Sequence, residues 1–276
     1  MAKLKLLNNK IIGDFQKPYI VAELNTSHFG DIEIAKQMIL KAKYCGCDCV
    51  KFQSWSSDSL YSEDYYKKNP ISKRIFNKFS LKPSDIKLLS KFSRINNIDF
   101  ASTPYSLDEA KFLIEECEVP YIKIASMELN NLPYLSSLAE LQVPLILSTG
   151  MGQIDEIKNA VKTIEAKNHR LALLHCTSVY PSESSIIRLK NIEGLRELYP
   201  NFPIGYSDHS SDNLAAVLSI ALKTKVIEKH LTLDKEMKGP DHKASSTPSE
   251  FSNMVKEIRK TEKILGGFSK EVQEEE

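Results

Sequence analysis

The chain has 276 residues, and its 37 lysines and arginines nearly balance its 36 aspartates and glutamates, which leaves a net charge of +1. This balance argues against a strongly basic nucleic-acid-binding protein and against an acidic tail protein. No run approaches the roughly 18 apolar residues of a membrane span, and residues 1–10 lack the pattern of a signal peptide. We therefore expect a cytoplasmic protein that binds neither nucleic acid nor membrane.

The first predicted element is a short β-hairpin over residues 3–15, with Asn8 and Asn9 at its turn. Eight β-rich runs follow, and their starts lie 22 to 50 residues apart. Most intervals have room for one helix and two short loops, which is the spacing of βα units. The eight predicted strands span residues 19–24, 49–54, 99–104, 121–126, 144–150, 171–176, 202–207 and 225–232.

Helical periodicity fills the intervals, because apolar residues recur there three and four positions apart. The predicted helices span residues 32–44, 83–95, 107–116, 154–166, 213–222 and 248–265. Eight regular units without a long polar linker predict one closed (β/α)₈ barrel over residues 1–267, a fold that needs about 250 residues. A doubly wound open sheet is the alternative. We expect the hairpin to close the amino-terminal mouth of the barrel and residues 268–276 to form a polar tail.

One interval is longer than the others. Between Ser54 and Leu81 lies an insertion that contains Trp55, Tyr61 and Tyr65. Since it follows the second strand of the barrel, it is expected at the carboxyl-terminal end of the strands, where barrel enzymes have their active sites. We interpret it as a flap over the site, and a disordered loop is the alternative.

Five cysteines are present. Cys45, Cys47 and Cys49 alternate across a predicted helix–strand junction, which allows either a zinc site or small buried thiols in a reducing compartment. Cys117 and Cys176 lie in apolar context and are predicted to belong to the core.

Polar residues gather at the carboxyl ends of the predicted strands. Lys51 and Lys123 lie within strands, and the hydroxyls of Thr103, Ser126 and Ser148 end neighbouring ones. Because lysine binds phosphate as a point charge and hydroxyls add directional donors, this set predicts a pocket for a phosphorylated or carboxylated substrate. The alternative is a polar core in which the lysines pair with Glu23 and Glu128.

Two histidines, His209 and His230, end adjacent strands, and neutral imidazole is a common ligand of transition metals. With Glu23, Glu128 or Asp208 nearby, the site would offer mixed nitrogen and oxygen ligands, which suit Mn²⁺, Mg²⁺, Co²⁺ or Fe²⁺. Hydrogen-bonded core histidines are the alternative. His28 and His242 lie in predicted loops and are available to a substrate, and Asp241 is an acceptor suited to sugar hydroxyls.

These residues belong to nine motifs through which the chain resembles the sialic acid synthase family, whose members make N-acetylneuraminate, legionaminate or pseudaminate. The motifs run in family order over nearly the whole chain: AELNTSHFG (22–30), VKFQ (50–53), STP (102–104), YIKIASMELNN (121–131), LSTGM (147–151), LLHCTSVYP (173–181), GYSDHS (205–210), VIEKHLTLD (226–234) and GPDHKAS (239–245).

The resemblance implies a metal-dependent enzyme on a (β/α)₈ barrel. Such an enzyme joins phosphoenolpyruvate to the open-chain aldehyde of an N-acylated hexosamine, with water, and forms a nine-carbon 2-keto acid and phosphate. The implied acceptor is N-acetylmannosamine or a bacterial diamino-dideoxy relative. The implied cofactor is a divalent metal, Mn²⁺ first, with Mg²⁺ or Co²⁺ as alternatives.

The resemblance also implies roles for individual residues. Glu23 would act on protons or on the attacking water, and Glu228 would be a second carboxylate beside the metal, which His209 and His230 would bind. The sugar would contact Gln53, Glu128, Tyr180 and Asp241. Phosphoenolpyruvate would be held by Lys51, Thr103, Lys123, Ser126, Ser148, Ser178 and Ser207.

Family members usually continue into a small antifreeze-like domain that reaches the partner's site in a dimer, and this sequence ends before such a domain. A homodimer is still an expectation, but the absence of this domain from the sequence weakens it. Two other functions stay open: a Schiff-base aldolase that uses Lys123 and needs no metal, and a non-catalytic sugar-binding barrel.

Overall fold

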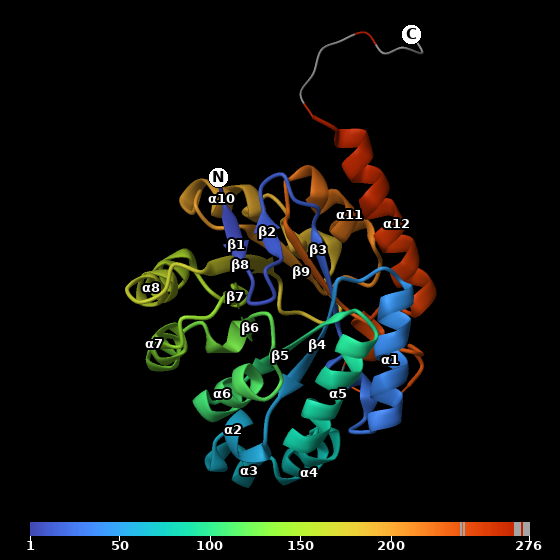
Figure 1. Ribbon diagram of the computed structural model, residues 1–276. Helices are drawn as coiled ribbons and strands as arrows, with labels where there is room; N and C mark the ends of the chain where they lie inside the picture. The colour runs from blue at the N-terminus through green and yellow to red at the C-terminus, as the bar shows by residue number, and fades with distance from the viewer. Residues whose placement is uncertain (238, 240, 268–271, 273–276) are drawn as a thin grey trace.

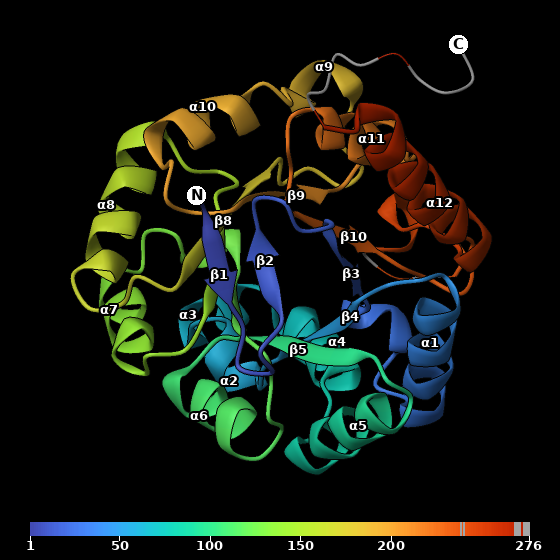
Figure 2. The same ribbon diagram turned by 45° about the horizontal axis from the view of Figure 1, so that its top comes forward.

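The computed structural model describes residues 1–237, 239, 241–267 and 272, and the predicted tail at residues 268–276 lies almost wholly outside this part. Within the described residues, eight parallel strands close into a barrel, with β10 beside β3, so the predicted (β/α)₈ fold is confirmed and an open sheet is excluded (Figure 2). The strands are β3 (Tyr19–Glu23), β4 (Cys49–Ser54), β5 (Asp99–Pro104), β6 (Ile122–Ile124), β7 (Leu145–Ser148), β8 (Leu171–Cys176), β9 (Ile204–Asp208) and β10 (Val226–His230).

Helices surround the strands on the outside (Figure 2): α1 (Ile32–Tyr44), α5 (Pro83–Ile95), α6 (Leu107–Glu115), α7 (Leu132–Glu140), α8 (Ile154–Glu165), α10 (Asn191–Leu198), α11 (Leu214–Ala221) and α12 (Pro248–Leu265). Local sequence defines where several of them begin. The Asp31 carboxylate accepts from the first free N–H groups of α1, and Thr247 forms a capping box with Glu250 ahead of α12. None of the helices in the described ranges is long and apolar enough to cross a membrane.

The predicted hairpin is present as β1 (Lys3–Lys5) paired antiparallel with β2 (Ile11–Gly13). Leu4, Leu6 and Ile12 are buried in one cluster with inward-facing barrel residues such as Tyr121 and Val226. Figure 2 shows the hairpin lying across the end of the barrel. The prediction that it closes the amino-terminal mouth is therefore confirmed.

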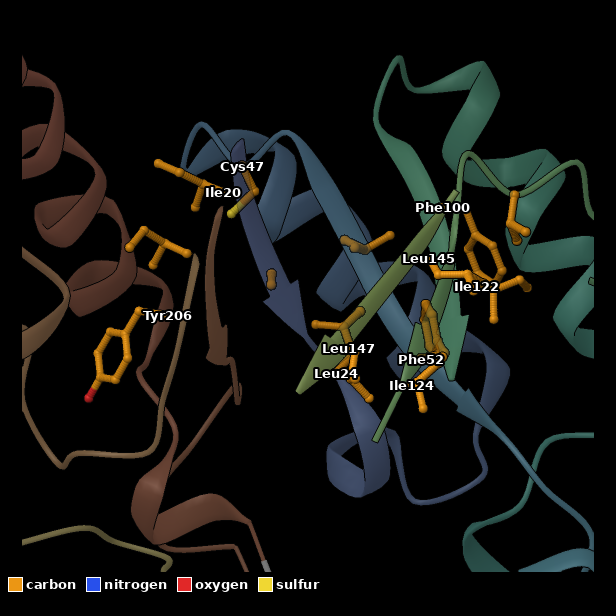
Figure 3. Close-up of a cluster of buried hydrophobic side chains, with 14 of the residues drawn as sticks. Ile20, Leu24, Cys47, Phe52, Phe100, Ile122, Ile124, Leu145, Leu147 and Tyr206 are labelled. Carbon is orange, nitrogen blue, oxygen red and sulfur yellow. The ribbon is translucent and has the colours of Figure 1, made fainter. Parts of the chain in front are cut away.

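A second, larger cluster fills the space between the strands and the helices, and Figure 3 shows part of it. Phe52 and Phe100 stack there from neighbouring strands, with ring centroids 5.3 Å apart. All five cysteines are buried and free, which agrees with the interpretation of Cys45, Cys47 and Cys49 as core residues. Because both faces of the strands are covered, the strands are apolar except where they approach the carboxyl-terminal mouth.

The insertion after β4 is helical. It forms α2 (Ser57–Leu60), α3 (Glu63–Lys68) and α4 (Pro70–Phe79), which lie at the end of the barrel away from the hairpin (Figure 1). Aromatic contacts hold these short helices together, with the Tyr61 and Phe76 rings 5.3 Å apart. Three strands, predicted over 121–126, 144–150 and 225–232, are shorter than expected because the chain turns away at their polar carboxyl ends, for example into the 3₁₀ helix η2 (Ser126–Glu128).

Candidate active site

The carboxyl ends of the strands surround a cavity of about 540 Å³, within the usual range for small-molecule sites. Thirteen of the fifteen predicted site residues line it. The insertion contributes Leu60, Tyr61 and Phe76, and Trp55 precedes α2 in the same wall. The insertion therefore covers the site, as a flap would.

Two lysines and two glutamates form a buried network on the floor of the cavity. The Lys51 ammonium forms an ion pair with the Glu23 carboxylate and lies 3.7 Å from Glu228 Oε2. Lys123 Nζ is 3.6 Å from Glu228 Oε1. The parallel register places Glu23 directly opposite Lys51 on neighbouring strands. Both lysines are thus paired with carboxylates, as the polar-core alternative predicted, but Glu228 takes the place expected for Glu128. The paired lysines still line the cavity, so a ligand can reach them.

Hydroxyl groups complete the lysine environment. Lys51 Nζ donates to Thr103 Oγ1 at 3.1 Å, and Lys123 Nζ donates to Ser148 Oγ at 2.7 Å. Ser207 Oγ donates to Glu228 Oε1 at 3.1 Å. An anion that entered the cavity would meet two ammonium groups and several hydroxyl donors that point inward from different strands.

Gly150 lies against two more of the predicted hydroxyls. Its backbone N–H donates to Ser126 Oγ at 3.0 Å. A Cβ at this position would lie 2.3 Å from Ser178 Oγ and 2.8 Å from Ser126 Oγ. Since real Cβ atoms do not approach other atoms this closely, any larger residue here would force one or both serine hydroxyls to move. The place of Gly150 directly after Ser148-Thr149 is the signal from which sequence reasoning could have found it.

Burial and charge act against each other in the network. Burial alone would raise the pKa of Glu228, but Lys123 and Lys51 outweigh it and lower this pKa to about 2. Burial raises the pKa of Glu23 in spite of its contact with Lys51. Burial also lowers the pKa of Lys123, although Glu228 opposes the effect. Two carboxyl groups in one cavity therefore differ in proton affinity, an arrangement that separates a proton acceptor from a permanent anion.

His209 and His230 face each other across adjacent strands, with ring centroids 5.6 Å apart. His209 Nδ1 donates to the Thr177 carbonyl at 2.8 Å, so Nε2 is the ring nitrogen available to a ligand. Burial lowers the pKa of His230 to about 4, so its ring is neutral, and within the described part of the chain its buried Nδ1 has no hydrogen-bond partner. Burial would lower the pKa of His209, but its contacts with the Cys176 thiol and the Thr177 carbonyl outweigh burial and raise this pKa, so a metal at its Nε2 would displace a proton. With that proton displaced, the two imidazoles fit a divalent metal that keeps open positions.

As far as the structure describes the chain, the two histidines do not belong to a complete protein cage for a metal. Among the residues that the structure describes, no group of three or more histidines, cysteines, aspartates and glutamates is arranged to hold an ion. The two histidines are thus the protein donors on which a metal would depend, and the remaining positions would be left for substrate or water.

The four residues predicted to contact the sugar fall into two groups. Gln53 and Tyr180 line the cavity, and the Tyr180 ring lies 4.1 Å from that of His209. Glu128 does not line it, and its carboxylate accepts from Asn131 at 2.8 Å. Asp241 does not line the cavity either. Its Oδ2 accepts hydrogen bonds from Asn25 Nδ2 at 2.7 Å and from Thr26 Oγ1 at 2.8 Å.

Some lining residues were missed or misjudged. Cys176 is buried, as predicted for a core residue, but it also lines the cavity, where its Sγ lies 3.8 Å from His209 Nδ1. Tyr105 lines the cavity and donates to Gln53 Oε1 at 2.7 Å.

Two histidines that were expected to be available to a substrate, His28 and His242, are buried and do not line the cavity. The His28 ring contacts Phe52, and the His242 ring contacts Phe29. Their surroundings depend on tertiary packing that loop position does not reveal.

Comparison with known proteins places these features in one family. Residues 38–270 match the NeuB family. The chain is 37% identical to N,N'-diacetyllegionaminic acid synthase of Legionella pneumophila over 94% of this chain and 76% of that protein. It is 41% identical to an uncharacterised protein of Methanocaldococcus jannaschii over 98% of this chain and 78% of that one. The solved structure of N-acetylneuraminic acid synthetase from Leptospira borgpetersenii superposes with a TM-score of 0.90 and 32% identity, over 99% of this chain and 94% of that chain.

The chain is a (β/α)₈ barrel with two buried lysines in the cavity at its carboxyl-terminal mouth, and these proteins match it over nearly its whole length. Together these features define a barrel synthase. The chain belongs to the NeuB family of sialic-acid-type synthases.

Proposed function

We propose that the protein condenses phosphoenolpyruvate with the open-chain aldehyde of an N-acylated hexosamine, with water, to give a nine-carbon sialic-acid-type 2-keto acid and phosphate. The acceptor would be N-acetylmannosamine or a bacterial diamino-dideoxy relative. The observation that carries the proposal is the joint presence, in one cavity, of the anion-binding pair Lys51 and Lys123 and of the imidazoles His209 and His230.

Phosphoenolpyruvate would occupy the floor of the cavity. Lys51 and Lys123 would neutralise its phosphate and carboxylate, and the hydroxyls of Thr103, Ser148 and Ser207 would orient it. Ser126 and Ser178, which lie beside Gly150, would accommodate the remaining anionic oxygens. The ammonium groups already face carboxylates, so the ligand would enter a site whose charges are fixed before binding.

A divalent metal would be held by His209 and His230, with Glu228 close by, and Mn²⁺ is the first candidate before Mg²⁺ and Co²⁺. Bound there, it would supply Lewis-acid polarisation of the aldehyde oxygen. The Tyr180 ring lies over His209 and edge-on to His230, 5.7 Å away, and would limit the access of water to this side.

Glu23 is suited to the proton transfers. In the reaction the C3 carbon of phosphoenolpyruvate attacks the aldehyde carbon, and C2 becomes an electron-poor centre that water captures. The raised pKa of Glu23 equips its carboxylate to take the proton of that water, while the anionic Glu228 stabilises the positive C2 centre. The former aldehyde oxygen takes up a proton, which balances the one that Glu23 takes from the water. The C2 hydroxyl then gives up its proton as the bond between C2 and the phosphate oxygen breaks, which leaves the 2-keto group and releases phosphate, whose charge the two lysines stabilise.

The acceptor would occupy the outer half of the cavity. Gln53 and Tyr180 would contact its hydroxyls, and Asp241 and Glu128 would have to act from outside the described lining. Trp55, Tyr61 and Phe76 form an aromatic wall suited to the apolar part of an N-acyl group.

The test is phosphate release from phosphoenolpyruvate in the presence of Mn²⁺ and a panel of N-acyl hexosamines. We expect release that depends on the acceptor and is abolished by EDTA, with the product identified by mass. Absence of release with every acceptor would leave the sugar-binding barrel as the better interpretation.

A Schiff-base aldolase is a second candidate, because burial lowers the pKa of Lys123 and so favours the free amine. Borohydride trapping with a 2-keto acid distinguishes the two. Covalent trapping at Lys123 with turnover that resists EDTA would favour the aldolase, whereas EDTA-sensitive turnover without trapping supports the synthase.

A further inference from the structure

A fully buried ion pair lies directly behind the two histidines. Lys229 Nζ is 2.7 Å from Asp208 Oδ2, and both side chains have 0% exposure. The two residues are register partners on β9 and β10. Because side chains alternate along a strand, they point away from the cavity that His209, His230 and Glu228 line. Neither residue can touch a substrate in the cavity, and the proposed chemistry uses neither.

The pair holds the backbone on both sides of His209. Lys229 Nζ donates to the Ser210 carbonyl at 2.8 Å, and the Ser210 N–H donates to Asp208 Oδ1 at 2.9 Å. Asp208 Oδ1 also accepts from the Tyr206 hydroxyl at 3.1 Å. Asp208 and Ser210, the residues on either side of His209, are thus both bound by the Lys229 ammonium group. Lys229 itself directly precedes His230 in the chain.

Stability alone does not account for such a pair. Removing two charges from water costs free energy that their attraction often does not recover, and apolar residues of similar size can replace a buried pair without loss. Fixing one geometry is the better-supported use of buried ion pairs. Groups behind metal ligands also orient those ligands, and their loss typically weakens metal binding roughly 10- to 100-fold.

We propose that Asp208 and Lys229 are positioning residues that fix the separation and orientation of His209 and His230 for one divalent cation. The inference rests on the metal site of the proposed function. It assigns the pair no contact with metal or substrate, and its effect passes through the backbone of residues 208–210 and 229–230.

The experiment measures Mn²⁺ binding directly, by the electron paramagnetic resonance signal of free Mn²⁺, with folding checked by circular dichroism. The variant Asp208→Asn/Lys229→Gln removes both charges and retains polar groups at both positions. We expect its dissociation constant for Mn²⁺ to rise at least tenfold. Lys235→Met is the matched control, because it breaks the partly exposed Lys235–Glu250 pair, 2.8 Å apart, and should leave Mn²⁺ binding unchanged.

A milder variant guards against loss of the fold. Tyr206→Phe removes one hydrogen bond to Asp208 and keeps the buried ring, so we expect a smaller rise in the same dissociation constant, about two- to fivefold. Unchanged Mn²⁺ binding in a folded double variant, or in Tyr206→Phe where the double variant does not fold, would overturn the positioning role while the metal site stands. Absence of Mn²⁺ binding to the wild type would overturn both.

Discussion

At the amino-terminal end of the barrel, Leu4, Leu6 and Ile12 of the hairpin pack on Val21, Cys49 and other apolar residues, whereas a few ångströms along the same strands the interior holds lysines, carboxylates and imidazoles. The change occurs within single strands. On β4, Cys49 faces the hairpin, and Lys51 and Gln53, two and four positions later, line the cavity. In the same way, Tyr121 directly before β6 is followed by Lys123, and Ile146 on β7 is followed by Ser148.

The difference teaches where stability and chemistry reside. Every second side chain of a strand points into the barrel. Along this inward face the first residues are apolar and the last ones are polar. The apolar layer excludes water from the lower barrel, and the ion-paired network above it is held on strands that cannot shift independently. Changes at the two ends should therefore affect different measurements.

The largest expected effect belongs to the polar end. Glu23→Gln keeps the size of the side chain and removes the proton acceptor, so we expect kcat to fall roughly 10²- to 10⁴-fold. The melting temperature should fall only a little, because burial disfavours the charged form of Glu23 and Lys51 keeps Glu228 as a second carboxylate partner. Steady-state phosphate release together with calorimetry checks both. Full activity in this variant would move the proton-transfer role to another group.

At the apolar end, Leu6→Ala should remove buried contacts between the hairpin and the barrel. We expect the free energy of unfolding to fall by about 2–5 kcal/mol, with the KM values of the folded enzyme unchanged. Denaturant titration measures the first and initial rates the second. The exposed neighbour Leu7 gives the control, since Leu7→Ala removes no core contact. A large change in KM without loss of stability would contradict the division between the two ends.

Gly150→Ala sharpens the comparison within the polar end. The new methyl group would displace Ser126 or Ser178, so we expect the KM for phosphoenolpyruvate to rise about tenfold, which corresponds to about 1.4 kcal/mol. Gly194→Ala is the matched control, because a Cβ there would meet no atom within 4 Å. Equal KM values in the two variants would show that the space beside the serines is not used.

The smallest expected effect is on the pH dependence of stability. The pKa of Glu228 lies below its ordinary value of about 4.3, so its ionised form stabilises the folded state above that pH. This contribution is lost as the pH falls through about 2. Glu228→Gln should therefore be less stable than wild type at pH 7 and should lose less stability between about pH 5 and pH 2.

Acid-unfolding curves of the two proteins check this expectation. Glu140→Gln, which changes an exposed carboxylate paired with Lys167, is the control and should follow the wild-type curve. Parallel curves for Glu228→Gln and wild type would mean that the lysines do not stabilise the anion of Glu228.

Much of the fold could be predicted because its signals are local. Apolar runs at regular intervals indicated the strands, and Asn8-Asn9 indicated the hairpin turn. The ends of the strands were less predictable, since the chain leaves β6 at Ile124 to form a 3₁₀ helix. The flap was expected from its position, but its three short helices depend on contacts such as that between Tyr61 and Phe76.

By itself the sequence determined the barrel fold and the division of its interior into an apolar and a polar end. Side chains alternate along a strand, so every second residue faces the interior, and its position along the strand decides which mouth of the barrel it lies near. Only the tertiary structure decided the partners. Glu228 pairs with both lysines, Asp241 is held by Asn25 and Thr26, and Cys176 meets His209 in the wall. These contacts join residues from different strands and loops, and their distances depend on the closure of the barrel and the stagger of its strands, which no single segment specifies.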